Sequence, residues 1–188
     1  MLSSFMSATE IISKVSLAGE SMVGKTSLIR RYVLEQFDDK YLMTIGTEIS
    51  KKSISFKEAD VGDINMTFMI WDIVGLSGYH SQLHSAHFRG AKGALLVCDV
   101  TRPETLEVLG EWAQAIMKVT KDIPVVFLAN KSDLKFAVQE EELAALAKKY
   151  DTKYFLTSAK TGQNVNEAFE ALGRKMVSRM KESPDEKK

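Results

Sequence analysis

Residues 19–26 read Gly19-Glu-Ser-Met-Val-Gly24-Lys25-Thr26, and the fold class follows from this stretch. It matches the phosphate-binding pattern G-x-x-x-x-G-K-[ST], the P-loop, between a predicted strand over Ile11–Ala18 and a predicted helix over Thr26–Val33. The glycines let the backbone curl so that successive N–H groups face a phosphate chain. Lys25 would reach the β- and γ-phosphates, and the Thr26 hydroxyl would hold Mg²⁺. A chance turn before a helix is the alternative, and the flanking strand and helix argue against it.

Strands and helices alternate along the chain on both sides of this loop. Apolar runs predict six strands, over Ile11–Ala18, Glu48–Phe56, Asn65–Trp71, Ala94–Val100, Pro124–Ala129 and Lys153–Thr157. Apolar residues three and four apart predict further helices, over Glu107–Val119, Gln139–Tyr150 and Val165–Met180. Lys51–Met69 is typical of a hairpin that turns at residues 58–63. We therefore predict an α/β fold: a mostly parallel six-stranded sheet with one antiparallel edge strand and helices on both faces.

The composition is that of an ordinary soluble domain. The 188 residues carry 25 Lys and Arg against 25 Asp and Glu, 45% are hydrophobic, and there is one cysteine. Zero net charge argues against nucleic-acid binding, and a lone Cys98 excludes an internal disulfide or a multi-cysteine zinc site. No apolar run is as long as a membrane span, and no signal peptide is evident. We predict one domain over residues 11–181, an N-terminal extension over 1–10 and a disordered tail over 182–188.

Two short motifs after predicted strands indicate which base the nucleotide carries. Asn130-Lys131-Ser-Asp133 follows the fifth strand, and Ser158-Ala159-Lys160 follows the sixth. The carboxylate of Asp133 can accept from N1–H and the exocyclic amine of guanine, whereas it would repel the N1 lone pair of adenine. The Ala159 N–H would donate to guanine O6, Asn130 would brace the loops, and the Lys131 stem would cover the base. We predict guanine recognition, which disfavours the alternative of a P-loop kinase or ATPase.

A third motif, Trp71-Asp72-Ile-Val-Gly75, ends another predicted strand. Asp72 can reach Mg²⁺ through water, as the second acidic element of a P-loop protein does. The Gly75 N–H would approach the γ-phosphate. A structural turn is the alternative, and the match to the P-loop argues against it.

The order of these motifs resembles the Ras superfamily of small GTPases, with the Rab branch closest. The resemblance covers about residues 11–180 and also includes Thr44-Ile-Gly46 and Asp99-Val-Thr101. It implies that Phe37 lies beside the guanine, that Tyr41 closes over the phosphates, and that Thr44 binds Mg²⁺ and the γ-phosphate. The implied metal ligands are Thr26, Thr44 and Asp72, and the implied catalytic residues are Lys25, Thr44 and Gly75. The implied nucleotide-binding set is Gly19, Glu20, Ser21, Met22, Val23, Gly24, Lys25, Thr26, Ser27, Phe37, Tyr41, Thr44, Asp72, Gly75, Asn130, Lys131, Asp133, Ser158, Ala159 and Lys160.

The resemblance also implies a molecular switch that cycles between GTP and GDP forms. Thr44 and Gly75 would be held only while a γ-phosphate is present and released on hydrolysis. Effectors would bind residues 37–50 and 75–90, and exchange factors and GTPase-activating proteins would act on the same protein. We expect a cytoplasmic monomer, acting in signal transduction and vesicle trafficking and recruited to membranes through partners.

Leu76 departs from the family pattern, which normally has a glutamine directly after Gly75. Leucine cannot orient the attacking water, so we expect slow or partner-assisted hydrolysis, or a hydrolysis-deficient scaffold as the alternative. His80, His84 and His87 follow at helical spacing. In one interpretation they are functional: His80 replaces the missing glutamine, or the three histidines bind a metal. In the other, which we favour, they form a polar face of a helix.

Membrane attachment is a second departure. The residues from Lys181 onward include no cysteine for prenylation, and Met1-Leu2 lacks the Met-Gly of myristoylation, so no lipid anchor is evident. Leu2, Phe5, Met6 and Ile12 would line one face of an amphipathic helix, as in an Arf-like membrane segment. A disordered or strand-extending start is the interpretation we favour.

Overall fold

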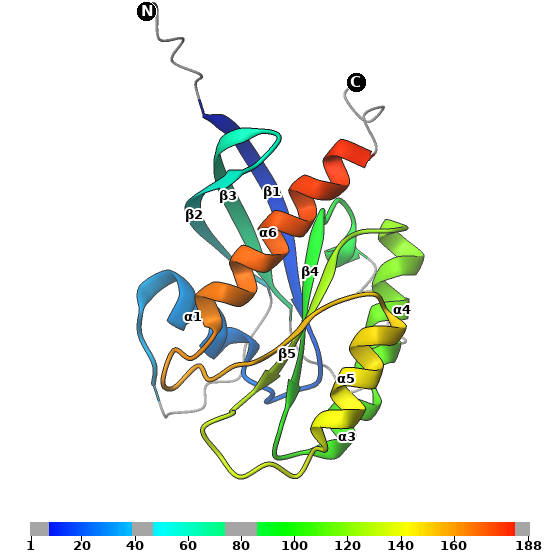
Figure 1. Cartoon of the computed structure of the whole chain (residues 1–188). Helices are drawn as coiled ribbons and strands as arrows, with labels where there is room; N and C mark the ends of the chain where they lie inside the picture. The colour runs from blue at the N-terminus through cyan, green and yellow to red at the C-terminus, as the bar shows by residue number, and fades with distance from the viewer. Residues whose placement is uncertain (1–7, 39–46, 74–85, 183–188) are drawn as a thin grey trace, which may run out of the picture.

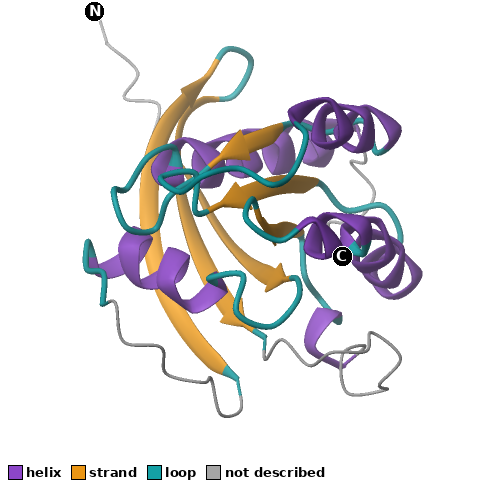
Figure 2. Cartoon of the chain, turned by 90° about the horizontal axis from the view of Figure 1, so that it is seen from below, coloured by secondary structure: helices purple, strands orange, loops and turns teal. Residues whose placement is uncertain are grey.

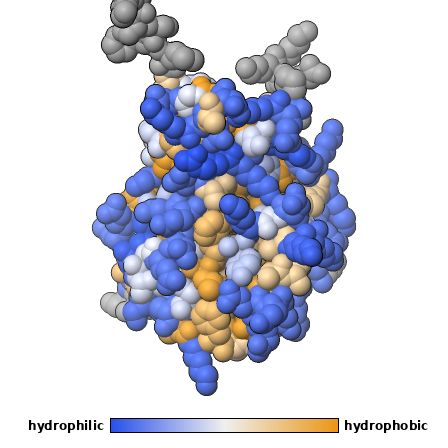
Figure 3. All heavy atoms as spheres, viewed as in Figure 1, coloured by the Kyte–Doolittle hydropathy of each residue, from blue (hydrophilic) through white to orange (hydrophobic). Residues whose placement is uncertain are grey.

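The computed structural model describes residues 8–38, 47–73 and 86–182 (Figure 1). Several predicted features lie outside these residues, among them Tyr41, Thr44, Gly75, Leu76, His80 and His84. Among the described residues, no helix has the length and apolar character needed to cross a membrane. Hydrophilic side chains cover most of the face in Figure 3, with a narrow apolar strip between them.

The six predicted strands form one sheet. They are β1 (Thr9–Ala18), β2 (Glu48–Glu58), β3 (Gly62–Asp72), β4 (Gly93–Asp99), β5 (Val125–Asn130) and β6 (Tyr154–Leu156), in the order β2-β3-β1-β4-β5-β6. Within the described ranges only β2 is antiparallel, and it pairs with β3 at one edge. The predicted fold class is therefore confirmed. β1 begins two residues earlier than predicted, so Ile12 lies in a strand and does not belong to an N-terminal helix.

The helices are α1 (Lys25–Leu34), α3 (Pro103–Glu107), α4 (Leu109–Thr120), α5 (Glu140–Lys149) and α6 (Val165–Glu182). The helix predicted over Glu107–Val119 is present as α4, but it begins at Leu109, because a turn at Val108 separates it from α3. The Thr105 hydroxyl accepts from the Asp99 N–H and donates to the Arg102 carbonyl, which ties α3 to the end of β4. The apolar face of α4, by contrast, packs on the sheet through Trp112 and its neighbours.

Two apolar cores lie on opposite faces of the sheet, between the sheet and its two layers of helices (Figure 2). One core joins α1 and α6 to the sheet, and Tyr32 stacks on Phe169 with ring centroids 3.7 Å apart. The other joins α3, α4 and α5 to the opposite face and contains Cys98, which is fully buried. Every residue of β4 and β5 is buried, as the continuous apolar runs predicted.

Candidate functional site

The carboxyl ends of the parallel strands meet at one edge of the sheet. β1 ends at Ala18 before the P-loop, and the last residues of β4 and β5, Asp99 and Asn130, lie side by side. Asp72 at the end of β3 pairs with Leu17 of β1. Ligands of open α/β sheets bind outside this edge, so the predicted motifs are brought together where a ligand is expected.

The P-loop backbone depends on two glycines. Gly19 has a φ of 143°, and a Cβ added there would lie 2.1 Å from the Val97 carbonyl oxygen of β4. Gly24 has a φ of 98°, and a Cβ there would lie 2.4 Å from the amide nitrogen of the Asn130 side chain. These close approaches let the loop lie directly against β4 and β5.

Lys25 is the first residue of α1, and its side chain curls back into the loop. Its ammonium donates to the Gly19 and Glu20 carbonyl oxygens, at 2.8 Å each. Burial lowers the pKa of Lys25 from 10.5 to about 8, although Asp72 and Glu20 raise it in part. A phosphate chain bound in the loop would supply the negative charge that this buried ammonium needs.

Asp72 and Thr26 form the part of the site that would hold a metal. The Thr26 hydroxyl donates to Oδ2 of Asp72, while Oδ1 is buried and has no hydrogen-bond partner in the described part of the chain. Burial raises the pKa of Asp72, despite the hydrogen bond from Thr26 and the charge of Lys25. An unsatisfied carboxylate oxygen beside a hydroxyl suits Mg²⁺, which is held by one or two protein oxygens, phosphates and water. The described residues contain no cluster of three or more His, Cys, Asp or Glu that could hold a metal by themselves.

Asn130 connects the P-loop with the loop after β6. Its amide nitrogen donates to the Val23 carbonyl at 2.9 Å, and its Oδ1 accepts from the Ala159 N–H at 3.2 Å. The Ser158 hydroxyl donates to Oδ1 of Asp133 at 2.6 Å, which orients that carboxylate. The geometry thus brings the two predicted base-binding motifs together. The Ala159 N–H would have to leave Asn130 in order to donate to guanine O6.

Lys131 makes a contact that the sequence did not indicate. Its ammonium lies 2.6 Å from Oδ2 of Asp99, which is fully buried at the end of β4. The Arg102 guanidinium reaches the same oxygen at 3.2 Å and donates to the Ser21 carbonyl at 2.8 Å. Asp99 and Arg102 therefore join the base-binding motif to the P-loop.

Arg31 is another residue that sequence reasoning missed. From α1 it donates to the Ala159 carbonyl at 2.7 Å and the Lys160 carbonyl at 2.6 Å, and it also donates to the Glu35 carbonyl at 3.0 Å. The first two acceptors lie more than 120 residues further along the chain. No local pattern indicates such a partner.

The remaining predicted residues lie around this cluster. Glu20 accepts from the Trp112 indole N–H at 3.3 Å, and Val23 is fully buried. Ser27 is half-buried in α1, and Phe37 packs against the core on the α1 side. Of the three histidines, His87 is described, and its Nδ1 lies 3.2 Å from the Thr47 hydroxyl.

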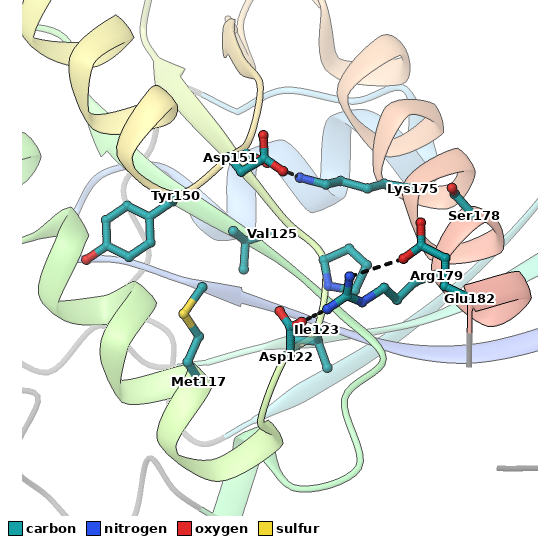
Figure 4. A pocket seen from close by; sticks show the side chains of 11 residues that line it. Met117, Asp122, Ile123, Val125, Tyr150, Asp151, Lys175, Ser178, Arg179 and Glu182 are labelled. Atoms are coloured by element: carbon teal, nitrogen blue, oxygen red, sulfur yellow. Dashed lines mark hydrogen bonds and ion pairs between the residues drawn. The ribbon is translucent and has the colours of Figure 1, made fainter. Parts of the chain in front are cut away.

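A cavity of about 300 Å³ lies at the other end of the parallel strands, beside the start of β5 and the end of α6 (Figure 4). Its basic side chains are already engaged: Arg179 pairs with Asp122 and Glu182, and Lys175 donates to the Asp151 carbonyl. None of the predicted nucleotide-binding residues lines it, so it is separate from the candidate site.

Comparison with known proteins gives matches that span the sheet and its strand-end loops. A profile of the Ras family matches residues 14–178. The chain is 32% identical over 173 residues to the Ras-related protein Rab-13 of the dog, Canis lupus familiaris, covering 90% of this chain and 82% of the relative. Rab-13 of cattle, Bos taurus, is similar to the same extent.

Proposed function

Because the chain belongs to the Ras family and is a Rab-like small GTPase, we propose that its strand-end site binds GTP and GDP and hydrolyses GTP slowly. One observation carries the proposal: Lys25, Asp72 and the Asp133–Ser158 pair, three chemically different recognition elements, lie at the same edge of one sheet. A phosphate chain, a metal ion and a guanine each have a matching group there.

Each element has a distinct role in the proposed reaction. Water attacks the γ-phosphorus in line, the bond from that phosphorus to the β–γ bridging oxygen breaks, and GDP leaves while the proton of water passes to the released phosphate. The Lys25 ammonium and the P-loop N–H groups stabilise the charge that develops on the phosphate oxygens. Thr26, Thr44 and Asp72 would hold Mg²⁺, which neutralises charge on the β- and γ-phosphates when bound. The buried Oδ1 of Asp72, which no described residue bonds, supports this assignment.

The switch itself is proposed to lie in residues 37–50 and 75–90. Thr44 and Gly75 would contact the γ-phosphate in the GTP form and lose that contact on hydrolysis, so an effector that recognises these segments distinguishes the two forms. Exchange factors and GTPase-activating proteins are the expected regulators, and an activating protein would supply an arginine to the transition state.

Leu76 is the reason for proposing slow hydrolysis. A leucine has no donor or acceptor with which to orient water, and unassisted hydrolysis by Ras is already slow, with a rate on the order of 10⁻⁴ s⁻¹. The second candidate function, a GTP-locked scaffold, rests on the same residue and differs in having no hydrolysis even with an activating partner.

A binding and single-turnover assay tests the proposal. The protein is expected to bind GTP in preference to ATP, and to release phosphate at a rate below about 10⁻⁴ s⁻¹. Leu76→Gln should raise that rate by about tenfold or more, because it restores a group that positions water. Preference for ATP would contradict guanine binding, and equal rates in the parent and Leu76→Gln would contradict the role of Leu76. Acceleration of the parent by cell extract would exclude the scaffold.

A further inference from the structure

Arg102 lies at the turn between β4 and α3, directly before the Pro103 that begins α3. Its guanidinium spans two groups: Nε bonds Oδ2 of Asp99 at 3.2 Å, and Nη2 donates to the Ser21 carbonyl at 2.8 Å. Two bonds in different directions hold the planar guanidinium in one orientation. About two-thirds of the side chain is buried, so water has limited access to these contacts.

The bond to Ser21 sets the direction of a whole peptide unit. In a trans peptide the C=O and the following N–H point to opposite sides, and the 21–22 peptide is not cis. Because the Ser21 carbonyl points toward Arg102, the Met22 N–H points away from it. A flipped peptide would instead turn the carbonyl oxygen, with its partial negative charge, to the side that the N–H now faces.

Met22 makes this peptide unit unusually dependent on a tether. Its φ is 65°, in the left-handed region, which is strained for a residue that has a Cβ. Its side chain is 54% exposed, so packing does little to hold that conformation. A strained backbone conformation persists only where the surrounding structure holds it. Here Arg102 donates to the carbonyl of Ser21, the residue before Met22.

Asp99 provides a charged and fixed anchor for Arg102. Burial raises its pKa, but hydrogen bonds from Lys131 and Thr101 outweigh that effect, so the pKa of Asp99 is lowered and the group stays ionised. The Thr101 N–H and hydroxyl donate to Oδ1, while Lys131 and Arg102 share Oδ2. One buried carboxylate thus connects a lysine of the base-binding motif with the arginine that holds the P-loop.

We infer that Arg102 is a positioning residue, which keeps the Ser21–Met22 peptide in its phosphate-binding orientation and couples the P-loop through Asp99 to Lys131. The inference rests on the proposed function. Arg102 reaches the loop backbone and would not need to touch the nucleotide. Through the loop it would affect how the phosphates are bound, whereas Asp133 would bind the base itself.

GDP dissociation from purified variants tests this role. Removing a charged hydrogen bond to the loop should speed dissociation of GDP from Arg102→Ala by about tenfold or more. Arg102→Lys should not restore the parent rate, because a lysine cannot hold Asp99 and Ser21 in one rigid fork. Arg179→Ala is the matched control, since Arg179 also pairs with carboxylates but at the other end of the parallel strands. The preference for GDP over inosine diphosphate, which reports the Asp133 contact, should stay unchanged in Arg102→Ala.

Repeating the measurement in the Met22→Gly variant distinguishes a specific effect of the Arg102–Ser21 bond from a general loss of structure. In Met22→Gly the left-handed backbone is no longer strained, so adding Arg102→Ala should speed dissociation by clearly less than it does in the parent. Equal effects in both backgrounds, full rescue by Arg102→Lys, or a parent-like rate in Arg102→Ala would each overturn the inference while leaving guanine binding intact. A parent protein that does not bind GDP would overturn the proposed function and this inference with it.

Discussion

Lys25 places a buried positive charge in the candidate site. Its ammonium is buried between two backbone carbonyls, and burial lowers its pKa to about 8. Carbonyl dipoles compensate a buried charge only in part, whereas a phosphate would compensate it fully. The residue is therefore better satisfied by a bound nucleotide than by the loop alone.

A pH dependence of GDP binding follows from this pKa. Bound phosphate raises the pKa of Lys25, so below pH 8 the lysine is already charged, and above pH 8 binding requires proton uptake. The affinity should therefore fall above pH 8, by at most about tenfold per pH unit. Without nucleotide, pH affects the folding stability in the opposite direction. The unfolded chain keeps the Lys25 proton up to about pH 10.5, whereas the folded chain loses it near pH 8, so the free energy of unfolding should rise between pH 8 and 10.5. Calorimetry between pH 7 and 9 measures both affinity and proton uptake. Lys25→Arg, which keeps its charge, should take up no proton, and equal uptake in both proteins would contradict the assignment.

Helix α1 braces two loops of the candidate site. It begins at Lys25 of the P-loop, and its Arg31 donates to two carbonyls of the 158–160 loop. The helix therefore links the proposed phosphate end of the site to its proposed base end. Away from the candidate site, Arg174 of α6 has a similar structural role at the end of β2. It donates to the Lys57 carbonyl and pairs with Glu58.

These two arginines form a matched pair for mutation. Arg31→Ala should release the 158–160 loop, lower the affinity for GDP by about tenfold and speed amide exchange in residues 157–163, because charged hydrogen bonds to three carbonyls are lost. Arg174→Ala should leave GDP affinity unchanged and speed exchange only in the β2–β3 hairpin. Fluorescence titration and hydrogen exchange measure both. Identical GDP affinities in the two variants would contradict the bracing role of α1.

For the whole molecule, one sheet edge collects groups from several strand ends, and ligand binding there should stabilise the entire fold. At a GDP concentration one hundred times Kd the gain is about 2.7 kcal/mol, which for a domain of this size raises Tm by about 5–10 °C. Chelating Mg²⁺ should remove part of that shift. In Asp72→Asn the Mg²⁺-dependent part of the shift should be smaller than in the parent, because the neutral amide is a poor metal ligand while Thr26 remains. Thermal unfolding with GDP, ADP and EDTA checks this. An equal shift with ADP, or an unchanged Mg²⁺ effect in Asp72→Asn, would contradict the site.

Much of this architecture could be predicted because its causes are local. The nearly all-apolar runs of β4 and β5 predict strands buried on both faces, and the glycines of residues 19–26 predict a loop whose N–H groups face a phosphate chain. The turn at Val108 was missed because the helical spacing of buried apolar residues continues across it, from Leu106 to Leu109 and Trp112.

Residue type and local spacing were enough to establish the order of strands and helices, the phosphate-binding loop and the motifs that point to guanine. The groups that hold this site in shape could be found only in the folded chain. Arg102 meets Ser21 across 81 residues, and Arg31 meets Ala159 across 128. Such bonds depend on which strand ends lie side by side and on where a side chain crosses between them, so they arise only once the sheet has formed.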